Sequence, residues 1–215
     1  MSEHMALENL TVLDLTRVLA GPFCTMMLAD MGANVIKIEV PKGGDDTRSY
    51  PPFRAKNLNG ERESVYFANI NRNKKGITLN LKAPEGKEIF KELVKKADIV
   101  VENYRPGVMD KLGLGYDVLK EINPRIIYAA VSGFGCYGPY HLRPGYDILA
   151  QAMGGMMSIT CSKGGEPTRA GSALGGRFCR PRGRCLLSLD SRSGSGGRGA
   201  RCQRFRAFRR SLSGW

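Results

Sequence analysis

The sequence predicts an α/β protein built on a Rossmann-like, mostly parallel sheet with helices on both faces. Short runs rich in aliphatic and β-branched residues alternate with segments of helical apolar spacing, which is the pattern of parallel strands joined by helical crossovers. One run, "DIVVENY" at 98–104, is nearly all apolar, as expected for a strand buried on both faces. The 215 residues are enough for one sizeable domain.

The first part of the chain is predicted to alternate strand, helix and strand. Residues 11–16 form a short run of strand-forming residues. Apolar side chains at helical spacing follow in 23–32, and Gly32 is expected to end that helix. Residues 33–40 alternate aliphatic and charged side chains, as in a strand, and 41–53 are a loop rich in Gly, Pro and Asp.

The middle of the chain repeats this alternation. Residues 75–82 are predicted as a third strand. Residues 83–97 follow as a helix, because they combine Pro84 in a first turn with one apolar stripe and paired Glu and Lys side chains. The buried strand at 98–104 is the fourth.

Residues 108–124 are predicted to be helical with turns, 125–135 to be the fifth strand, and 146–159 to be the last helical segment. Ligands of such folds bind outside the carboxyl ends of the strands. The loops that follow the strands are therefore the expected site: "RVLAGP", "PKGGDDTR", "ENYRPG" and "SGFGCYGP".

The net charge of +13 is distributed unevenly along the chain. Residues 177–215 hold 11 of the 33 basic residues, all of them Arg, and one acidic residue. The preceding 176 residues hold 22 basic and 19 acidic residues, a net of +3. The body therefore has the charge of an ordinary soluble protein, and nucleic acid is not its expected partner.

The cysteines and histidines favour a reducing, cytoplasmic location without a metal site. No two cysteines have C-x-x-C spacing, and His4 and His141 are the only histidines, so zinc is not expected. The scattered cysteines do not suggest a disulfide scaffold; they are Cys24, Cys136, Cys161, Cys179, Cys185 and Cys202. No signal peptide is visible in "MSEHMALENL", and no apolar stretch of about 20 residues suggests a membrane span.

A dinucleotide site is not favoured, because no G-x-G-x-x-G follows the first strand; "GLGYD" and "GFGCYG" follow other elements. Basic side chains near the predicted strand ends supply positive charge, either to an anionic ligand or to a solvated face. They are Arg72, Lys74, Lys75, Lys82, Arg105 and Lys111.

Seven segments, in order over residues 6–176, make the chain similar to the family III CoA-transferases. They are "VLDLTRVLAGPFCTMMLADMGANVIKIE", "GDDTR", "NRNKKGITLNLK", "ADIVVENYRPG", "INPRIIYAAVSGFG", "GYD" and "EPTRAGSALG". The resemblance implies coenzyme A or acyl-CoA as substrate, a free carboxylic acid as its partner, and no tightly bound cofactor. It also implies interlocked homodimers and a small second domain. The second domain is expected to be absent from these 215 residues, so the interlocked dimer is not expected for them.

The resemblance also implies CoA-contacting residues in the loops that follow the strands. Lys42 is expected to replace an arginine that the family often has at Val40. For Val18 and Leu79, packing in the core is the alternative role. The implied contacts are Val18, Leu19 and Ala20 beside adenine, Lys42, Leu79 and Lys82 beside the nucleotide, Asn103 and Tyr104 beside pantetheine and diphosphate, and the basic Lys111 and Arg143.

The family's chemistry needs an aspartate that directly follows G-x-A-L-G. Its carboxylate attacks the thioester to form a mixed anhydride, and the released CoA thiolate re-forms a thioester on it, so that one difficult exchange becomes easier steps. Here residues 171–175 read "GSALG", and the next residue is Gly176. The sequence therefore predicts a chain without its nucleophile and without transferase activity.

The resemblance ends where the arginine-rich tail begins, which divides the chain into 1–176, part of the large domain, and 177–215. We expect the tail to be translated out of frame and disordered. Codons for its first residues, "RFC", can be chosen that give Asp-Phe-Val one base later. A genuine Arg/Gly/Ser segment that binds RNA is the alternative.

The related α-methylacyl-CoA racemases are the second enzymatic alternative. They use a histidine in "G-H-D", where this chain has Tyr146. A tyrosine with its pKa near 10 is a poor base near neutral pH, so a transferase is favoured. Asp147 is expected either to assist in the acceptor pocket or to cap the helix that follows. Within the family resemblance, the segment "GDDTRSYPPF" is most similar to the transferases that act on dicarboxylates, which implies a dicarboxylate acceptor.

Overall fold

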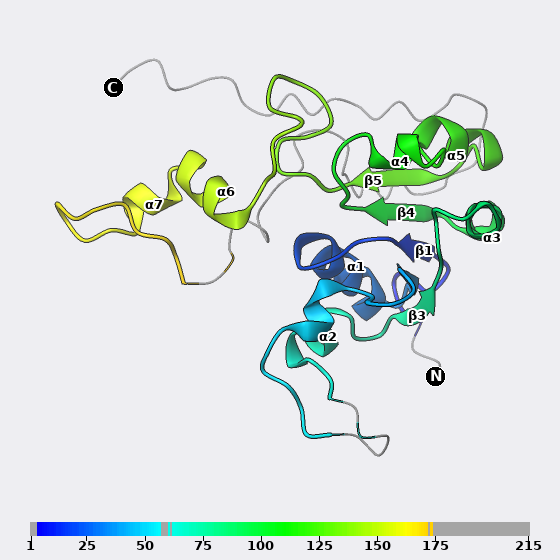
Figure 1. Cartoon of the computed structure of the whole chain (residues 1–215), viewed down its shortest axis with the longest axis horizontal. Coiled ribbons are helices and arrows are strands. Elements are labelled where there is room, and N and C mark those ends of the chain that lie inside the picture. The colour runs from blue at the N-terminus through cyan, green and yellow to red at the C-terminus, as the bar shows by residue number, and fades with distance from the viewer. Residues whose placement is uncertain (1–3, 57–59, 61, 172, 174–215) are drawn as a thin grey trace.

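The computed structural model describes residues 4–56, 60, 62–171 and 173, and within them it confirms the predicted α/β fold (Figure 1). Five parallel strands form one sheet in the order β3-β2-β1-β4-β5. The strands are β1 (Thr11–Asp14), β2 (Asn34–Glu39), β3 (Lys75–Thr78), β4 (Ile99–Glu102) and β5 (Ile127–Ala130). Gly176 and the tail 177–215 lie outside the described residues.

Helices cover both faces of the sheet because the central strand is apolar on both sides. On β1, Val12 packs with α1 (Ala20–Asp30) in one core cluster, while Leu13 belongs to a larger cluster with α3 (Pro84–Lys96). Both side chains are fully buried. Successive side chains of a strand alternate between faces, so Asp14 lies on the α1 side, as Val12 does.

Helix ends follow the signals in the sequence. Gly32 takes φ 100° directly after α1, a conformation that glycine adopts freely. Pro84 is the first residue of α3. Predicted segment 108–124 is two helices, α4 (Val108–Lys111) and α5 (Tyr116–Ile122), separated by Gly113 at φ 71°.

Two short elements were not predicted. A 3₁₀ turn, η1 (Asp46–Ser49), lies in the segment expected to be a loop, and α2 (Val65–Ile70) follows it. The Ser64 hydroxyl caps α2 by accepting the N–H of Phe67 at 3.2 Å. Arg48 of η1 is part of the site described below, and Phe67 of α2 packs against its guanidinium at 3.8 Å.

The strand order reverses between β1 and β4, because the chain passes from the edge strand β3 through α3 to the far side of β1. The carboxyl ends of β1 and β4 therefore form a topological switch point, a place where α/β proteins commonly bind ligands. The Asp98 carboxylate accepts the N–H of Thr11 at 3.0 Å and fixes the register of the two strands.

Beyond β5 the chain leaves the sheet, and α6 (Asp147–Met153) and α7 (Met156–Ile159) lie apart from the five strands (Figure 1). The predicted helix at 146–159 is thus two short helices, since Gly155 takes φ 76° between them. Within the described residues, no helix has both the length and the apolar character needed to cross a membrane.

Candidate functional site

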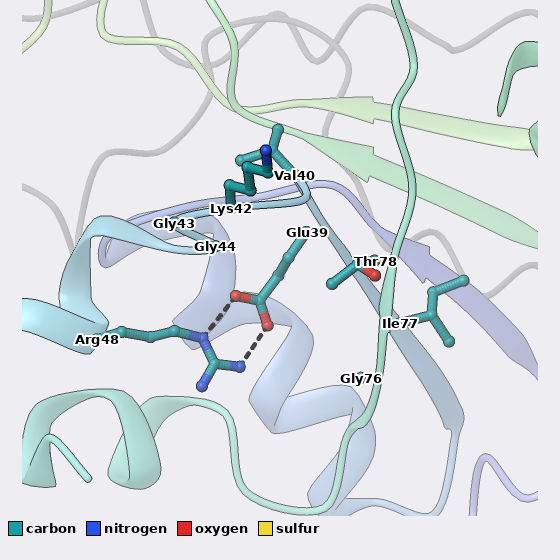
Figure 2. A pocket seen from close by; sticks show the side chains of 9 residues that line it. All are labelled: Glu39, Val40, Lys42, Gly43, Gly44, Arg48, Gly76, Ile77 and Thr78. Carbon is teal, nitrogen blue, oxygen red and sulfur yellow. Dashed lines mark hydrogen bonds and ion pairs between the residues drawn. The ribbon is translucent and has the colours of Figure 1, made fainter. Parts of the chain in front are cut away.

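A hollow of 480 Å³ lies at the carboxyl ends of β2 and β3 (Figure 2). We call it the β2–β3 hollow. On one side the loop after β2 contributes Lys42, Gly43 and Gly44, and on the other the exposed edge strand β3 contributes its backbone and short side chains. The residues that line it are Glu39, Val40, Lys42, Gly43, Gly44, Arg48, Gly76, Ile77 and Thr78.

A bidentate ion pair between Glu39 and Arg48 lies in the wall of this hollow. The Arg48 Nε and Nη2 atoms donate to the two carboxylate oxygens at 2.8 and 2.7 Å. Burial disfavours the charged form of Glu39, but these bonds outweigh it and lower the pKa of the carboxyl. Dinucleotide enzymes place an acidic side chain at this strand end to bind a ribose hydroxyl. Here the carboxylate is neutralised by Arg48, which suits a more anionic ligand.

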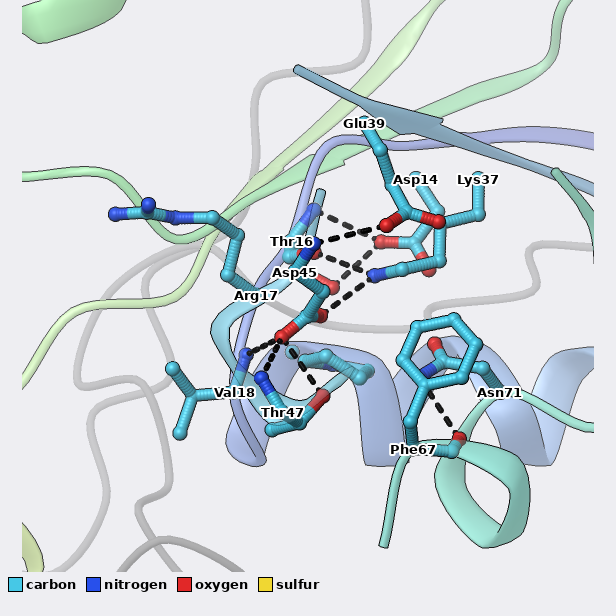
Figure 3. A network of polar contacts seen from close by, with 12 residues as sticks. Asp14, Thr16, Arg17, Val18, Lys37, Glu39, Asp45, Thr47, Phe67 and Asn71 are labelled. Carbon is cyan, nitrogen blue, oxygen red and sulfur yellow. Dashed lines mark hydrogen bonds and ion pairs between the residues drawn. The ribbon is translucent and has the colours of Figure 1, made fainter. Parts of the chain in front are cut away.

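Two fully buried ion pairs lie beneath the carboxyl ends of β1 and β2. Figure 3 shows the pair of Lys37 and Asp45. Lys37 Nζ donates to Asp45 Oδ2 at 2.9 Å, and Lys74 Nζ donates to Asp14 Oδ2 at 3.0 Å. Burial lowers the pKa of Lys74, partly offset by the Asp14 charge. For Asp45, burial opposes ionisation, but the Lys37 charge and donors from Thr47 bring its pKa below the usual value.

These pairs attach the loops of the site to the sheet. Lys37 and Glu39 are two residues apart on β2, so their side chains lie on the same face of the sheet, toward the loop 40–49. Lys37 binds the Asp45 side chain, and Glu39 Oε2 accepts the Asp45 N–H at 2.8 Å. Asp45 is thus fixed at both its backbone and its side chain, and the loop after β2 has a defined position.

At the carboxyl ends of β1 and β4, the Asn103 amide joins the two loops that follow these strands. Its Oδ1 accepts the N–H of Arg17 at 2.8 Å, and its Nδ2 donates to the Arg17 carbonyl at 2.7 Å. Asn103 thus holds the backbone of the Arg17–Ala20 turn, the segment between β1 and α1. Gly21 is required just beyond this turn, because a Cβ there would collide with the side chain of Thr16.

The residues expected beside adenine lie in the Arg17–Ala20 turn. Val18 is 36% exposed, so its side chain is not part of the core. Leu19 is the N-cap of α1, without a side-chain cap, and Ala20 is the first residue of that helix. The Arg17–Ala20 turn therefore exposes backbone groups and apolar side chains at the carboxyl ends of β1 and β4.

The residues expected beside the nucleotide divide into two groups. Val40 and Lys42 line the β2–β3 hollow, where Lys42 provides a cation. Leu79 packs against the larger core cluster, and its N–H donates to the Glu39 carbonyl at 2.9 Å. Lys82 is exposed beyond the end of β3 and does not line the hollow.

The remaining expected contacts are farther along the chain. Tyr104 is half-buried against the larger core cluster, and burial raises its pKa. Lys111 is the exposed last residue of α4. The Arg143 guanidinium stacks over the Tyr140 ring at 4.3 Å, on the segment that leaves the sheet. Neither Lys111 nor Arg143 lines the β2–β3 hollow.

Asp147 does not cap α6, because the N-cap is Tyr146 and Asp147 is the first helical residue. Its carboxylate accepts a hydrogen bond of 2.6 Å from Gln151 Nε2, and Gln151 Oε1 accepts the N–H of Ala170 at 2.9 Å. Gln151 is 1% exposed. A buried amide therefore connects Asp147 to the residue directly before "GSALG", the segment that precedes Gly176.

Glu102, the last residue of β4, is a buried acid that sequence reasoning missed. Its Oε2 accepts the Tyr104 N–H at 2.7 Å, and its Oε1 accepts the Tyr128 hydroxyl at 3.3 Å. Burial raises its pKa to about 7, against the effect of these hydrogen bonds. The sequence does contain a signal for this buried acid, because Glu102 directly follows "IVV" in a strand predicted to be buried on both faces.

Comparison with known proteins agrees with the α/β fold. Residues 7–177 match the family described as CoA-transferase family III. The chain is 52% identical over 169 residues to a succinyl-CoA:glutarate CoA-transferase of Mus musculus, and 49% identical over 172 residues to an acetyl-CoA:oxalate CoA-transferase of Acetobacter aceti. Among solved structures, it is similar to a CAIB/BAIF family protein from Brucella suis, with 45% identity and a TM-score of 0.77.

The similarity covers most of this chain but less than half of each relative. The two sequence alignments include 78% and 80% of this chain, and 37% and 43% of the relatives. The structural match includes 82% of this chain and 46% of the Brucella suis protein. The described sheet thus corresponds to one portion of a longer fold.

Proposed function

Because the chain belongs to CoA-transferase family III, we propose that it is the CoA-binding portion of an enzyme that transfers CoA from an acyl-CoA donor to a free carboxylic acid. The acceptor we propose is a dicarboxylate. Relatives named for glutarate and for oxalate are almost equally similar to this chain, and both compounds are dicarboxylates. The length of the dicarboxylate therefore depends on parts of the relatives that this chain does not cover.

The observation that supports this proposal most directly is the β2–β3 hollow at the carboxyl edge of the sheet. CoA carries a 3′-phosphate and a diphosphate, which need cationic and backbone N–H donors. Lys42 supplies a cation beside the backbone of two glycines, and the Glu39 charge is neutralised by Arg48. The Arg17–Ala20 turn would then contact the rest of the CoA molecule, at the carboxyl ends of β1 and β4.

We also propose that the chain, as its sequence stands, binds CoA without transferring it. Transfer in the family depends on a carboxylate directly after "GSALG", and Gly176 has no side chain to attack a thioester. Asp147 cannot take over this role if it stays bonded to Gln151, and its position suggests that it orients the segment before residue 171.

Calorimetric titration tests the binding proposal. We expect CoA to bind, and Lys42→Ala to weaken binding by about three- to tenfold, the loss of one partly solvated charge-assisted contact. Lys95→Ala, an exposed lysine in the last turn of α3, is the matched control and should bind CoA normally. If Lys42 contacts the 3′-phosphate, dephospho-CoA, which lacks that phosphate, should bind Lys42→Ala and Lys95→Ala equally well.

Two outcomes would contradict the proposals. Absence of CoA binding by a folded, unmodified chain would refute the binding role. Detection by mass spectrometry of an acyl adduct on the protein, after incubation with succinyl-CoA or acetyl-CoA, would show that another group replaces the missing aspartate.

A further inference from the structure

Val18 has a backbone conformation that its side chain disfavours. Its φ is 69°, in the left-handed region, where a β-branched residue is a steric outlier. Such a conformation persists only where the surroundings impose it, and it is most often found at functional sites. The contacts that impose it are therefore informative about the site.

Side chains from two other loops hold the residue and its neighbour. Asp45 Oδ1, from the loop after β2, accepts the Val18 N–H at 3.2 Å. Asn103, from the loop after β4, binds both backbone groups of Arg17. The Arg17–Ala20 turn is thus fixed from both sides of β1, and Figure 3 shows Asp45 directed at Val18.

Asp45 is in turn fixed by Lys37. The Lys37 ammonium donates to Asp45 Oδ2 at 2.9 Å and to the Thr16 carbonyl at 2.8 Å, so it holds both the aspartate and the residue before the turn. The side chains of Lys37 and Asp45 are 2% and 0% exposed. A buried ion pair generally adds little stability compared with apolar residues of the same size. Here its two side chains bind the backbone on both sides of Arg17, at the Thr16 carbonyl and the Val18 N–H.

We propose that Asp45 and Lys37 are positioning residues that hold the Arg17–Ala20 turn in the strained conformation in which it receives CoA. The proposal rests on the proposed function, since CoA is the ligand concerned. CoA binding then requires no reordering of the turn, because the protein already holds the unfavourable Val18 backbone conformation when it folds.

Two double variants separate the hydrogen bond from the ion pair. Lys37→Met with Asp45→Asn removes both charges but keeps an oxygen that can accept the Val18 N–H. Lys37→Met with Asp45→Ala removes that acceptor as well. Neither variant leaves an unpaired buried charge. Lys95→Met with Glu92→Ala, which removes an exposed ion pair on α3 away from the turn, is the control and should bind CoA as the unmodified chain does.

By calorimetry, we expect the Ala variant to bind CoA about tenfold more weakly than the Asn variant, because the turn must be ordered at each binding event. Val18→Gly should change CoA binding little in the unmodified chain, because the turn is already held at this positive φ. In the Ala variant, the same substitution should restore part of the lost affinity, because glycine adopts a positive φ without the steric cost that valine has. Equal affinities of the Ala and Asn variants, or an equal effect of Val18→Gly in both backgrounds, would overturn the proposal.

Hydrogen exchange at the Val18 amide tests the positioning without any ligand. We expect slow exchange in the unmodified chain and exchange at least about tenfold faster in the Ala variant, which lacks the acceptor of this N–H. A Val18 amide that exchanges freely in the unmodified chain would refute the proposal. If this amide is protected but CoA does not bind, the proposed function fails while the imposed geometry stands.

Discussion

Replacing Glu102 by Gln should stabilise the protein above neutral pH. Glu102 is 7% exposed at the end of β4. The groups that face it are the Tyr104 N–H, the Tyr128 hydroxyl and, farther away, the Asp110 carboxylate, and the Cys136 thiol also interacts with its charge. Glutamine can accept the Tyr104 N–H and donate to the Tyr128 oxygen, so the substitution removes the ionisable group without removing its hydrogen bonds.

The magnitude follows from the raised pKa. Burial raises the pKa of Glu102 from 4.5 to about 7 in the folded protein. Because the folded state holds this proton more tightly, its contribution to stability is complete below pH 4.5 and is lost as the pH rises to 7. Each pKa unit corresponds to about 1.36 kcal/mol, so the loss amounts to about 3 kcal/mol. Glu102→Gln should be more stable than the unmodified chain by this amount at pH 8, and equally stable at pH 4.

Urea unfolding at half-unit steps between pH 4 and pH 8 measures this difference. The two stability curves should separate as the pH increases from 4.5 to 7 and then remain parallel. Glu121→Gln, an exposed glutamate on α5, should follow the unmodified chain at every pH. Curves for Glu102→Gln and the unmodified chain that stay parallel over the whole range would refute the reasoning, since Glu102 would then titrate normally.

Two further substitutions test the core and the buried charges. Phe90→Ala should lower the free energy of unfolding by about 3–5 kcal/mol, because its fully buried ring fills the larger core cluster. Ile89→Ala is the control and should lower it much less, because Ile89 is 52% exposed. Chemical denaturation measures both values, and similar losses would contradict the packing described. Lys74→Met should cost about 3–5 kcal/mol by leaving a buried aspartate without its cation, while Arg72→Met removes an exposed pair and should cost less than about 1 kcal/mol. Equal losses in thermal unfolding for these two would show that the Lys74 pair is solvated.

The sheet could be predicted because its strands combine apolar runs with clear stops. The fourth strand was recognised from "DIVVENY", and all four residues of β4 are buried. The strand ends were less certain: β3 stops at Thr78 although the pattern continues to residue 82, since the chain turns into α3. Helix α2 was missed because six residues are too few to show a helical period.

The site was only partly predictable for a different reason. Val40 and Lys42 follow a strand directly, and that position alone places them at the carboxyl edge of the sheet. The partners of the buried charges have no such local signal. Lys74 is 60 residues from Asp14, and Lys37 meets Asp45 only because the loop after β2 folds back. Pairing of this kind depends on the tertiary structure.

The placement of β1 at the centre of the sheet has a consequence for synthesis on the ribosome. Of the five described strands β1 is synthesised first, yet one of its two neighbours, β4, pairs with it across a separation of 87 residues, as Val12 opposite Ile99. At about 5–20 residues per second, the apolar edge of β1 stays unpaired for roughly 4–17 seconds after the strand itself has been made. During translation this edge is available to chaperones and to neighbouring nascent chains, so the central strand is also the one most exposed to misassembly.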